Sequence, residues 1–207
     1  MRKKPNLIPR MERCAALQIM EPEKLKGRWH EEFSQYKSIR LEIGCGKGRF
    51  TCEQALREPE ILLIAVEKVQ DAMVVAEERA LAQEIPNVRF IDFDAEKLTD
   101  IFEDGEIERI YINFPDPWRK TRQYKRRLTA PAFLERYVHA LIADGEVWFK
   151  TDNEPLFRWS MESFAQNGWV VRSMPEGTPM TDYELKFTEQ GIPIHRVIAT
   201  APGKKLP

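Results

Sequence analysis

Short apolar runs alternate with amphipathic segments over most of this chain, from residue 38 to residue 168. The run ILLIAVE at residues 61–67 is apolar almost throughout, which is typical of a strand buried on both faces of a sheet. The next segment, residues 69–84, repeats apolar residues at the spacing of one helical face. Strands that alternate with helices form parallel, doubly wound sheets. The alternation therefore predicts an α/β fold.

The boundaries of the elements follow from this apolar period and from the glycines and prolines that interrupt it. We expect strands at residues 38–44, 61–67, 87–94, 107–114 and 145–152. We expect helices at residues 48–60, 69–84, 96–102, 130–143 and 153–168. No convincing long helix separates the last two apolar runs, residues 169–174 and 192–201, so these strands are expected to pair antiparallel. The predicted sheet is mostly parallel with an antiparallel closing strand.

The segment before the alternation has a weaker pattern. Residues 1–20 are expected to be irregular, and residues 21–36 to form a short helix with apolar residues at helical spacing. At 207 residues the chain fits one globular domain. We assign residues 38–207 to that domain and residues 1–37 to an N-terminal arm.

Charge and cysteine usage limit the classes of function. The 32 basic and 33 acidic residues give a net charge of -1, which is not that of a globally basic nucleic-acid binder. Cys14, Cys45 and Cys52 form no even disulfide framework and no metal-type spacing, and three scattered histidines argue against a zinc site. The start of the chain has no apolar signal segment, and no run is long enough to span a membrane. We therefore expect a metal-free cytoplasmic protein, monomeric or homodimeric.

A glycine-rich turn follows the first predicted strand, in the sequence LEIGCGKGRF. Gly44, Gly46 and Gly48 permit a tight turn and the close approach of a ligand to the backbone. The spacing differs from the G-x-G-x-x-G of dinucleotide-binding proteins. Glu42 stands just before the turn, where its charge would repel a pyrophosphate.

Acidic residues also follow the next two strands. Glu67 ends the second strand, at the distance from the turn where a ribose diol is usually held, and Asp94 ends the third. Acids at three successive strand ends suit a cofactor with a ribose, a nucleobase and a cationic centre. S-adenosylmethionine has all three features, whereas NAD carries a pyrophosphate.

The fourth predicted strand runs into the segment NFPDPWRKTRQYKRRL, residues 113–128. Pro115 and Pro117 end the strand because they fix φ and lack an amide donor, and they hold Asp116 between them. A cluster of cations follows, comprising Arg119, Lys120, Arg122, Lys125, Arg126 and Arg127. Such a cluster beside a strand end is typical of a site that binds nucleic-acid phosphates.

The motif E-x-G-C-G-x-G resembles the first motif of Rossmann-like class I methyltransferases. With NFPDPWRKTRQYKRRL, FKTDN and TDYE, residues 38–198 closely resemble the bacterial tRNA (guanine-N7-)-methyltransferase family. The resemblance implies methyl transfer from S-adenosylmethionine to N7 of a guanine in tRNA, in the variable loop (tRNA nucleotide 46).

The resemblance also implies roles for particular residues. The implied cofactor contacts are Glu42, Glu67, Asp94 and Asp116, and the implied substrate contacts are Lys120, Asp152, Thr181, Asp182, Tyr183 and Glu184. From the residues themselves we add Gly44 and Gly46 as cofactor contacts and Asp116 as the catalytic residue. On the same basis we expect RNA contacts from the rest of the basic segment, Arg122, Gln123, Tyr124, Lys125, Arg126, Arg127 and Leu128. Two positions depart from the family pattern, since Arg119 replaces a usual proline and Gln123 a usual histidine.

Guanine N7 carries a lone pair and no proton, so its methylation needs alignment more than a base. Asp116 would orient the reactants and offset the positive charge of the methylated purine; the alternative is an acid that merely suits a turn. Trp118 and Tyr124 could stack on bases, or Trp118 could pack in the core. Asp152 could bind the target nucleotide or cap the following helix.

Glu184 is a candidate for the choice of guanine. A carboxylate can accept both donors of the guanine Watson–Crick edge and would leave N7 free. The alternative is that Glu184 belongs to a solvated helix. Three rival functions remain at this point: methylation of an exocyclic amine, an RNA-binding module with a vestigial cofactor pocket, and an NAD oxidoreductase.

Overall fold

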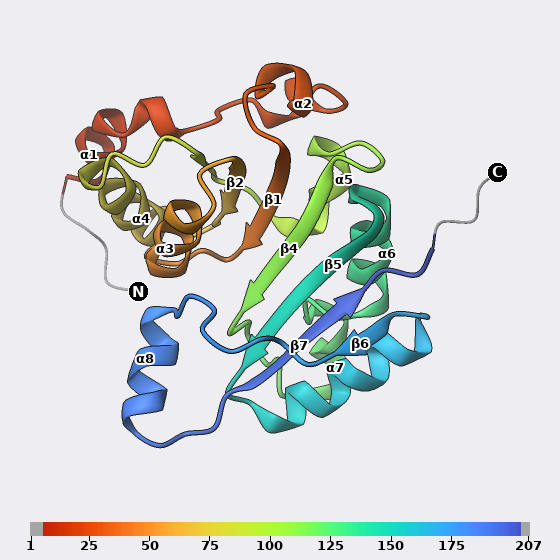
Figure 1. The fold of residues 1–207 in the computed structure, drawn as a ribbon. Coiled ribbons are helices and arrows are strands. Elements are labelled where there is room, and N and C mark those ends of the chain that lie inside the picture. Colours follow the sequence, from red (N-terminus) through yellow and green to blue (C-terminus); the bar gives the residue numbers. More distant parts are fainter. Residues whose placement is uncertain (1–5, 204–207) are drawn as a thin grey trace.

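The computed structural model describes residues 6–203 and has one seven-stranded sheet (Figure 1). The strand order is β3-β2-β1-β4-β5-β7-β6. The strands are β1 Ser38–Ile43, β2 Ile61–Val66, β3 Val88–Ile91, β4 Ile107–Asn113, β5 Leu141–Thr151, β6 Val170–Arg172 and β7 His195–Thr200. The α-helices are α1 Leu7–Arg13, α2 Trp29–Glu32, α3 Arg49–Arg57, α4 Gln70–Ala82, α5 Leu98–Ile101, α6 Pro131–Ala140, α7 Glu154–Gln166 and α8 Asp182–Glu189. Short 3₁₀ turns are η1 Ala15–Leu17, η2 Pro22–Leu25, η3 Ala95–Lys97 and η4 Thr121–Arg126.

The pairing of the strands confirms the predicted doubly wound, mostly parallel sheet. Strands β1 to β5 pair in parallel, and β7 runs antiparallel to both β5 and β6. The chain order reverses between β1 and β4, which are neighbours at the centre of the sheet. Such a switch point opens a crevice at the carboxyl ends of the strands. The topology therefore places any ligand site near the ends of β1 and β4.

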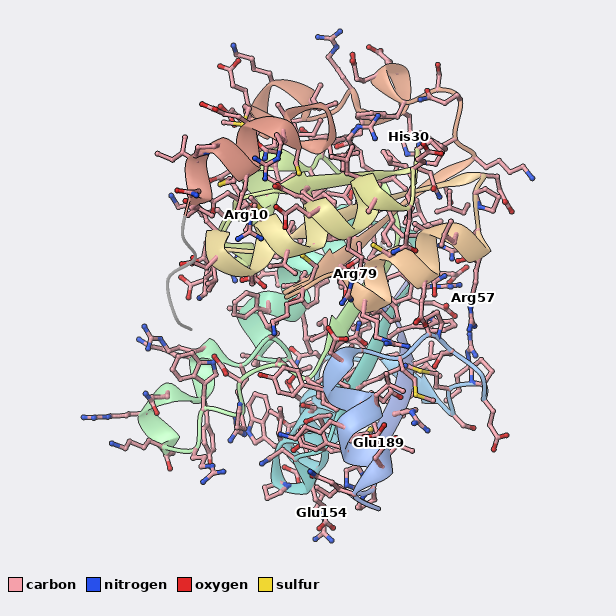
Figure 2. The ribbon with its side chains drawn as sticks, turned by 90° about the vertical axis from the view of Figure 1, so that its left-hand side faces the viewer. Arg10, His30, Arg57, Arg79, Glu154 and Glu189 are labelled. Carbon is pink, nitrogen blue, oxygen red and sulfur yellow. The ribbon has the colours of Figure 1, made fainter. Side chains whose placement is uncertain are left out.

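Two apolar layers cover the sheet, and the side chains of β2 alternate between them. Leu62, Ile64 and Val66 belong to the layer that contains α5, α6 and α7. Leu63 and Ala65 belong to the layer that contains α3 and α4. Burial on both faces explains why β2 is apolar at every position. Helix α8 lies on the same side of the sheet as α3 and α4 (Figure 2).

The N-terminal segment departs from the prediction of an irregular chain. Residues 7–13 form α1, which is anchored on α4 by a bidentate ion pair from Arg10 to Glu78 at 2.7 and 2.5 Å. This contact lies far along the sequence, so the local pattern gave no sign of it. For residues 1–5, the prediction of an irregular chain lies outside the described residues. The division at residue 37 stays a prediction.

The predicted helix at residues 21–36 is wrong as one element, because the chain breaks between η2 and α2. Gly27 has a φ of 75°, which ends the helical path. Its amide donates to the Glu106 carboxylate at 3.1 Å, and the amide of Trp29 donates to the same group at 3.2 Å. A tertiary partner therefore replaces the helical hydrogen bonds at this position.

In the part of the chain that the structure describes, no helix is long and apolar enough to cross a membrane.

Candidate active site

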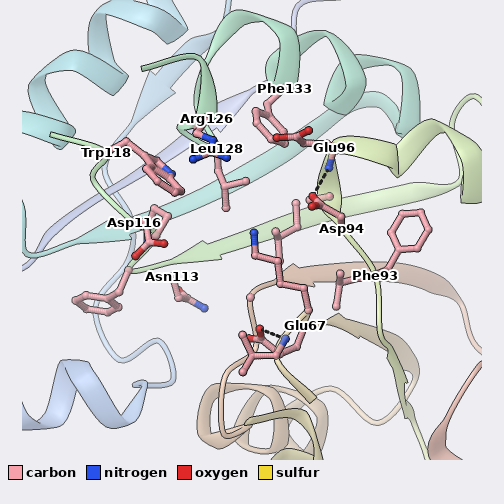
Figure 3. A pocket seen from close by; sticks show the side chains of 18 residues that line it. Glu67, Phe93, Asp94, Glu96, Asn113, Asp116, Trp118, Arg126, Leu128 and Phe133 are labelled. Atoms are coloured by element: carbon pink, nitrogen blue, oxygen red, sulfur yellow. Dashed lines mark hydrogen bonds between the residues drawn. The ribbon is translucent and has the colours of Figure 1, made fainter. Parts of the chain in front are cut away.

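A cavity of about 440 Å³ lies at the switch point, above the carboxyl ends of the central strands (Figure 3). Its volume falls in the range of small-molecule sites, which is about 300–1,000 Å³. Its polar walls include Gly44 after β1, Glu67 after β2, Asp94 after β3 and Asp116 after β4. Four of the predicted cofactor residues are therefore brought together around one space.

The glycine turn reaches the cavity at Gly44, and most of its amides are already bonded. The amides of Gly44 and Cys45 donate to the Val66 carbonyl at 2.8 and 3.2 Å, and the amide of Gly48 donates to the Cys45 carbonyl at 3.0 Å. Gly48 has a φ of 75° and packs so closely on α4 that an added Cβ would lie 2.6 Å from the Ala76 side chain. Phosphate sites need free amides, so the turn is a poor cradle for a pyrophosphate.

Glu67 ties the glycine turn to the end of β2. Its carboxylate accepts from the Gly46 amide at 3.0 Å and from the Val69 amide at 2.9 Å. A carboxylate has about four acceptor sites, so it can still accept further donors from the cavity. Asp94 caps η3 through the Glu96 amide at 3.0 Å and stays exposed. Gly46 does not line the cavity and acts there through Glu67.

Glu42 lies behind the cavity wall and does not line it. It is 1% exposed, and it accepts from the Thr51 hydroxyl at 2.5 Å and from the Asn113 side-chain amide at 3.2 Å. The predicted direct contact with a cofactor is therefore not available in this structure. Asn113 does line the cavity, and its side-chain amide donates to Glu42. This hydrogen bond links the buried carboxyl group to the cavity wall.

Burial raises the pKa of the Glu42 carboxyl to about 7, against the opposing hydrogen bonds from Thr51 and Asn113. Burial also raises the pKa of Glu77 to about 7. A carboxyl whose folded pKa exceeds its unfolded value stabilises the fold at low pH, and this contribution is lost as the pH rises through the folded pKa. We expect the free energy of unfolding to fall between about pH 4.5 and pH 7.

A pH series of thermal unfolding checks this prediction. Glu42→Gln should make the decrease smaller, since one of the two titrating carboxyls is gone while Glu77 remains. A cationic ligand in the cavity favours the ionised carboxylate, so its affinity should fall as the pH drops below about 7 in the wild type and much less in the variant. Equal pH dependence in both proteins would contradict the assignment.

The turn that carries Asp116 is strained on both sides. Phe114 has a φ of 51° and Trp118 a φ of 43°, and both are bulky residues in a region that favours glycine. Each such residue costs on the order of 1–3 kcal/mol and is typically found at functional sites. Between them Asp116 is exposed and faces the cavity (Figure 3).

The basic segment continues from this turn into η4 and divides into two environments. Five of the six cations are exposed, and one of them, Arg126, lines the cavity. The five are Arg119, Lys120, Arg122, Lys125 and Arg126. Arg126 also stacks over Trp118, with its guanidinium carbon 4.7 Å from the ring centroid. Trp118 therefore lines the cavity and is not a residue of the core.

The remaining residues of the segment correct the prediction of a uniform RNA contact. Arg127 is 4% exposed, too buried to bind a phosphate. Tyr124 stacks on Arg127 and packs against Trp159, so its ring is not free to stack on a base. Leu128 lines the cavity. Gln123 is half-buried, and its RNA contact stays a proposal.

The segment TDYE forms the start of α8, and its Glu184 is not the predicted solvated or guanine-reading carboxylate. Thr181 caps the helix by accepting from the Glu184 amide at 3.0 Å. Glu184 is 1% exposed, and its two oxygens pair with Lys150 at 3.1 Å and with Arg196 at 2.9 Å. At this burial the carboxylate is not exposed to a guanine edge. Burial lowers the pKa of Lys150, and Glu184 opposes that shift.

The same helix also borders the cavity and α4. Asp182 pairs with Arg79 of α4 at 3.5 Å (Figure 2 labels Arg79). Phe187 packs between Tyr183 and the cavity residue Phe114, with ring centroids at 6.0 and 6.1 Å. Tyr183 is 64% exposed and is the residue of this segment best placed to meet a large substrate.

Asp152 follows β5 and is exposed. The structure excludes the alternative that it caps α7, because Asn153 is the cap and accepts from the Leu156 amide at 2.9 Å. Asp152 is left available to a substrate.

Several cavity residues were not predicted, namely Asn113, Phe93 and Phe133. The asparagine in NFPDPW was the one available signal for them. Residues 6–203 contain no cluster of three or more potential metal ligands.

The sequence is similar to a family profile and to curated proteins over most of its length. A family profile with the description "Putative methyltransferase" matches residues 36–197. The curated tRNA (guanine-N(7)-)-methyltransferase of Lachnoclostridium phytofermentans is 44% identical over 87% of this chain and 89% of its own length. The protein of the same name from Bacillus cytotoxicus is 42% identical over 96% of this chain and 95% of its own. The chain belongs to the tRNA (guanine-N(7)-)-methyltransferase family.

Solved structures support the fold of this family member. The 16S rRNA methyltransferase KamB aligns with a TM-score of 0.64 at 16% identity and covers 86% of this chain and 94% of its own. The 16S rRNA (adenine(1408)-N(1))-methyltransferase from Catenulisporales acidiphilia aligns with a TM-score of 0.63 at 14% identity, over 89% of this chain and 94% of its own. At such low identity these similarities concern the fold alone, which is that of class I methyltransferases.

Proposed function

We propose that this protein transfers a methyl group from S-adenosylmethionine to N7 of a guanine in tRNA, in the variable loop. The observation that carries the proposal is one cavity with acids from three strand ends, whose lining includes Arg126, one of five exposed cations in the segment that follows Asp116. The acids suit a cationic cofactor, and the cations suit RNA phosphates. The names of the curated relatives support the same reaction. Because tRNA is the substrate, the reaction belongs in the cytoplasm.

The residues around the cavity fit S-adenosylmethionine better than NAD. The bonded amides of the glycine turn favour a ligand without a pyrophosphate. Glu67 would accept the ribose hydroxyls, as an acid at this strand end does in related folds, and Asp94 would accept the amine of the nucleobase. Glu42 and Asn113 would place negative charge and an amide near the cationic end. The intact set of acids also argues against a vestigial pocket.

When bound, S-adenosylmethionine supplies a methyl group on a sulfonium, whose carbon–sulfur bond breaks as the N7 lone pair forms the new carbon–nitrogen bond. Positive charge thereby moves onto the purine. Asp116 faces the cavity at the end of β4 and would stabilise that charge as it develops. No proton has to be removed from N7. Asp116 therefore acts through charge and position, on a turn fixed by two prolines.

The exposed cations of the η4 segment would hold the tRNA backbone beside the cavity. Phosphate contacts position a nucleic acid without reading its bases. Lys120, Asp152 and Tyr183 lie on three separate segments and are proposed to contact the target nucleotide or its neighbours. Reading of the guanine edge falls to Asp152, since Glu184 is paired in the interior.

Glu67→Ala is expected to weaken cofactor binding by about 1–3 kcal/mol, because a charge-assisted pair of hydrogen bonds is lost. This corresponds to a rise in Kd of roughly 5- to 150-fold. Titration calorimetry with S-adenosylmethionine measures it. Glu60→Ala is a matched control, because Glu60 is an exposed acid at the opposite end of β2. Equal affinities in the two variants would remove Glu67 from the site.

The proposed function is tested by incubation with methyl-labelled S-adenosylmethionine and tRNA, followed by nucleoside analysis. We expect 7-methylguanosine as the labelled product. An N2-methylated guanosine would support the rival reaction on an exocyclic amine. Binding of tRNA without any transfer, together with no binding of the cofactor, would support a non-catalytic RNA-binding module.

A further inference from the structure

The strained backbone around Asp116 needs stabilising contacts from other parts of the protein. Phe114 and Trp118, which flank the two prolines, both have positive φ angles, at 51° and 43°. Strained conformations of this kind persist only where the surrounding structure fixes them. Pro115 and Pro117 lack amide donors, so the turn has little means of bonding to itself. Its own carbonyls must find donors elsewhere.

Arg127 supplies those donors from the interior. Its Nε donates to the Pro117 carbonyl at 3.0 Å, and its Nη2 makes a longer contact to the Trp118 carbonyl at 3.5 Å. These are the two residues that directly follow Asp116 in the chain. One guanidinium therefore spans the C-terminal half of the turn.

Two aromatic rings hold the Arg127 guanidinium in place. Its carbon lies 3.6 Å from the ring centroid of Tyr124 and 4.6 Å from that of Trp159. Tyr124 and Trp159 pack edge to face at 5.8 Å, and Trp159 belongs to α7. Stacking and a planar fork of donors are properties that arginine has and lysine lacks. The strained turn is thereby linked to a helix on the sheet.

Burial separates Arg127 from its basic neighbours. At 4% exposure it cannot reach a phosphate, whereas Lys125 is exposed on η4. A cation that releases no counterions on RNA binding adds nothing to the salt dependence of that binding. Replacing Lys125 should therefore change the salt dependence of RNA binding, whereas replacing Arg127 should not.

We propose that Arg127 is a positioning residue that holds the Asp116 turn in its reactive shape and does not contact tRNA. The inference rests on the proposed function for its activity measurements. The salt dependence of tRNA binding does not depend on which atom is methylated. The Arg127 proposal and the proposed function can therefore fail separately.

The first experiment measures the Kd of tRNA against salt concentration for Arg127→Met and for Lys125→Met. We expect Arg127→Met to keep the wild-type slope of log Kd against log salt, because a buried cation releases no counterion. Lys125→Met should lower that slope by about one, as expected for the loss of one phosphate contact. A slope reduced by about one in an Arg127→Met variant would show a phosphate contact and overturn the proposal.

The second experiment measures kcat and KM on tRNA for Arg127→Lys and Trp159→Leu. Trp159 lies outside the basic segment, so an RNA-contact role for Arg127 predicts that replacing Trp159 changes KM for tRNA and not kcat. We expect both variants to lower kcat by about tenfold or more, because small misplacement of a reacting group is costly, with KM for tRNA changed less than threefold. The Lys125→Met variant should instead raise KM.

Folding is monitored in the same variants by thermal unfolding and by cofactor affinity. A loss of kcat with retained cofactor affinity at a temperature well below Tm supports positioning. An unchanged kcat in Arg127→Lys would overturn it, as would a kcat that falls only in proportion to the folded fraction. If Arg127→Met fails to fold, Arg127→Lys and Trp159→Leu still decide the question.

Discussion

Asp116→Asn is expected to lower kcat for methyl transfer by roughly 100-fold or more, the size typical of losing one preorganised electrostatic group. Asparagine keeps the shape of the side chain and part of its hydrogen bonding but removes the charge. The turn should survive, because Pro115, Pro117 and the contacts of Arg127 set its backbone. Single-turnover kinetics with saturating cofactor and tRNA give the rate of the chemical step.

Asp144→Asn is a matched control for this variant. Asp144 also lies in a turn-like stretch with a positive φ, at 58°, and the change in charge is the same. It lies in the irregular stretch of β5 between the paired residues Leu141 and Glu146, near the amino end of the strand and away from the cavity at its carboxyl end. We expect wild-type turnover for Asp144→Asn. Near-normal turnover of Asp116→Asn would rule out an electrostatic role for Asp116.

Glu184→Ala is expected to lower the free energy of unfolding by about 3–5 kcal/mol, because it leaves the buried Lys150 without its charged partner. For a chain of this length that corresponds to a fall in Tm of roughly 6–20 °C. Asp182→Ala removes a partly exposed pair on the same helix and should cost about 1 kcal/mol or less. Urea denaturation of both variants measures the difference.

A double variant separates anchoring from recognition at this position. Lys150→Met with Glu184→Leu removes both buried charges together, which typically restores much of the stability. Arg196 is partly exposed and can turn to solvent. If Glu184→Ala leaves stability unchanged but removes the preference for guanosine over inosine at the target position, Glu184 reads the base and the anchoring role is wrong.

The local pattern of the sequence was sufficient for the sheet and for most of the helices that cover it. In β2 every position is buried, so the apolar run alone located the strand. The acids after β2, β3 and β4 could be placed together because parallel strands bring their carboxyl ends to one edge. Burial of Glu42 could not be predicted, because its partners are Thr51 and Asn113, and Asn113 lies 71 positions along the chain.

The residues that were misassigned are those whose partners lie far along the chain. Arg127 looks like its basic neighbours in sequence, and only the fold brings Trp159 against it. Glu184 pairs with Lys150, 34 positions earlier, and with Arg196. One local signal was available in this case, since T-x-x-E before apolar residues is a capping pattern. It predicts Thr181 as the cap and a helical position for Glu184, as observed.

The claim that the methyl group goes to N7 is tested most directly with a tRNA transcript in which 7-deazaguanosine replaces guanosine. This change removes the N7 lone pair and leaves the Watson–Crick edge and the exocyclic amine in place. We expect the substituted tRNA to bind with nearly the Kd of the unmodified transcript and to accept no labelled methyl group. Methylation of the substituted transcript at the rate of the unmodified one would contradict N7 as the acceptor and favour the exocyclic amine.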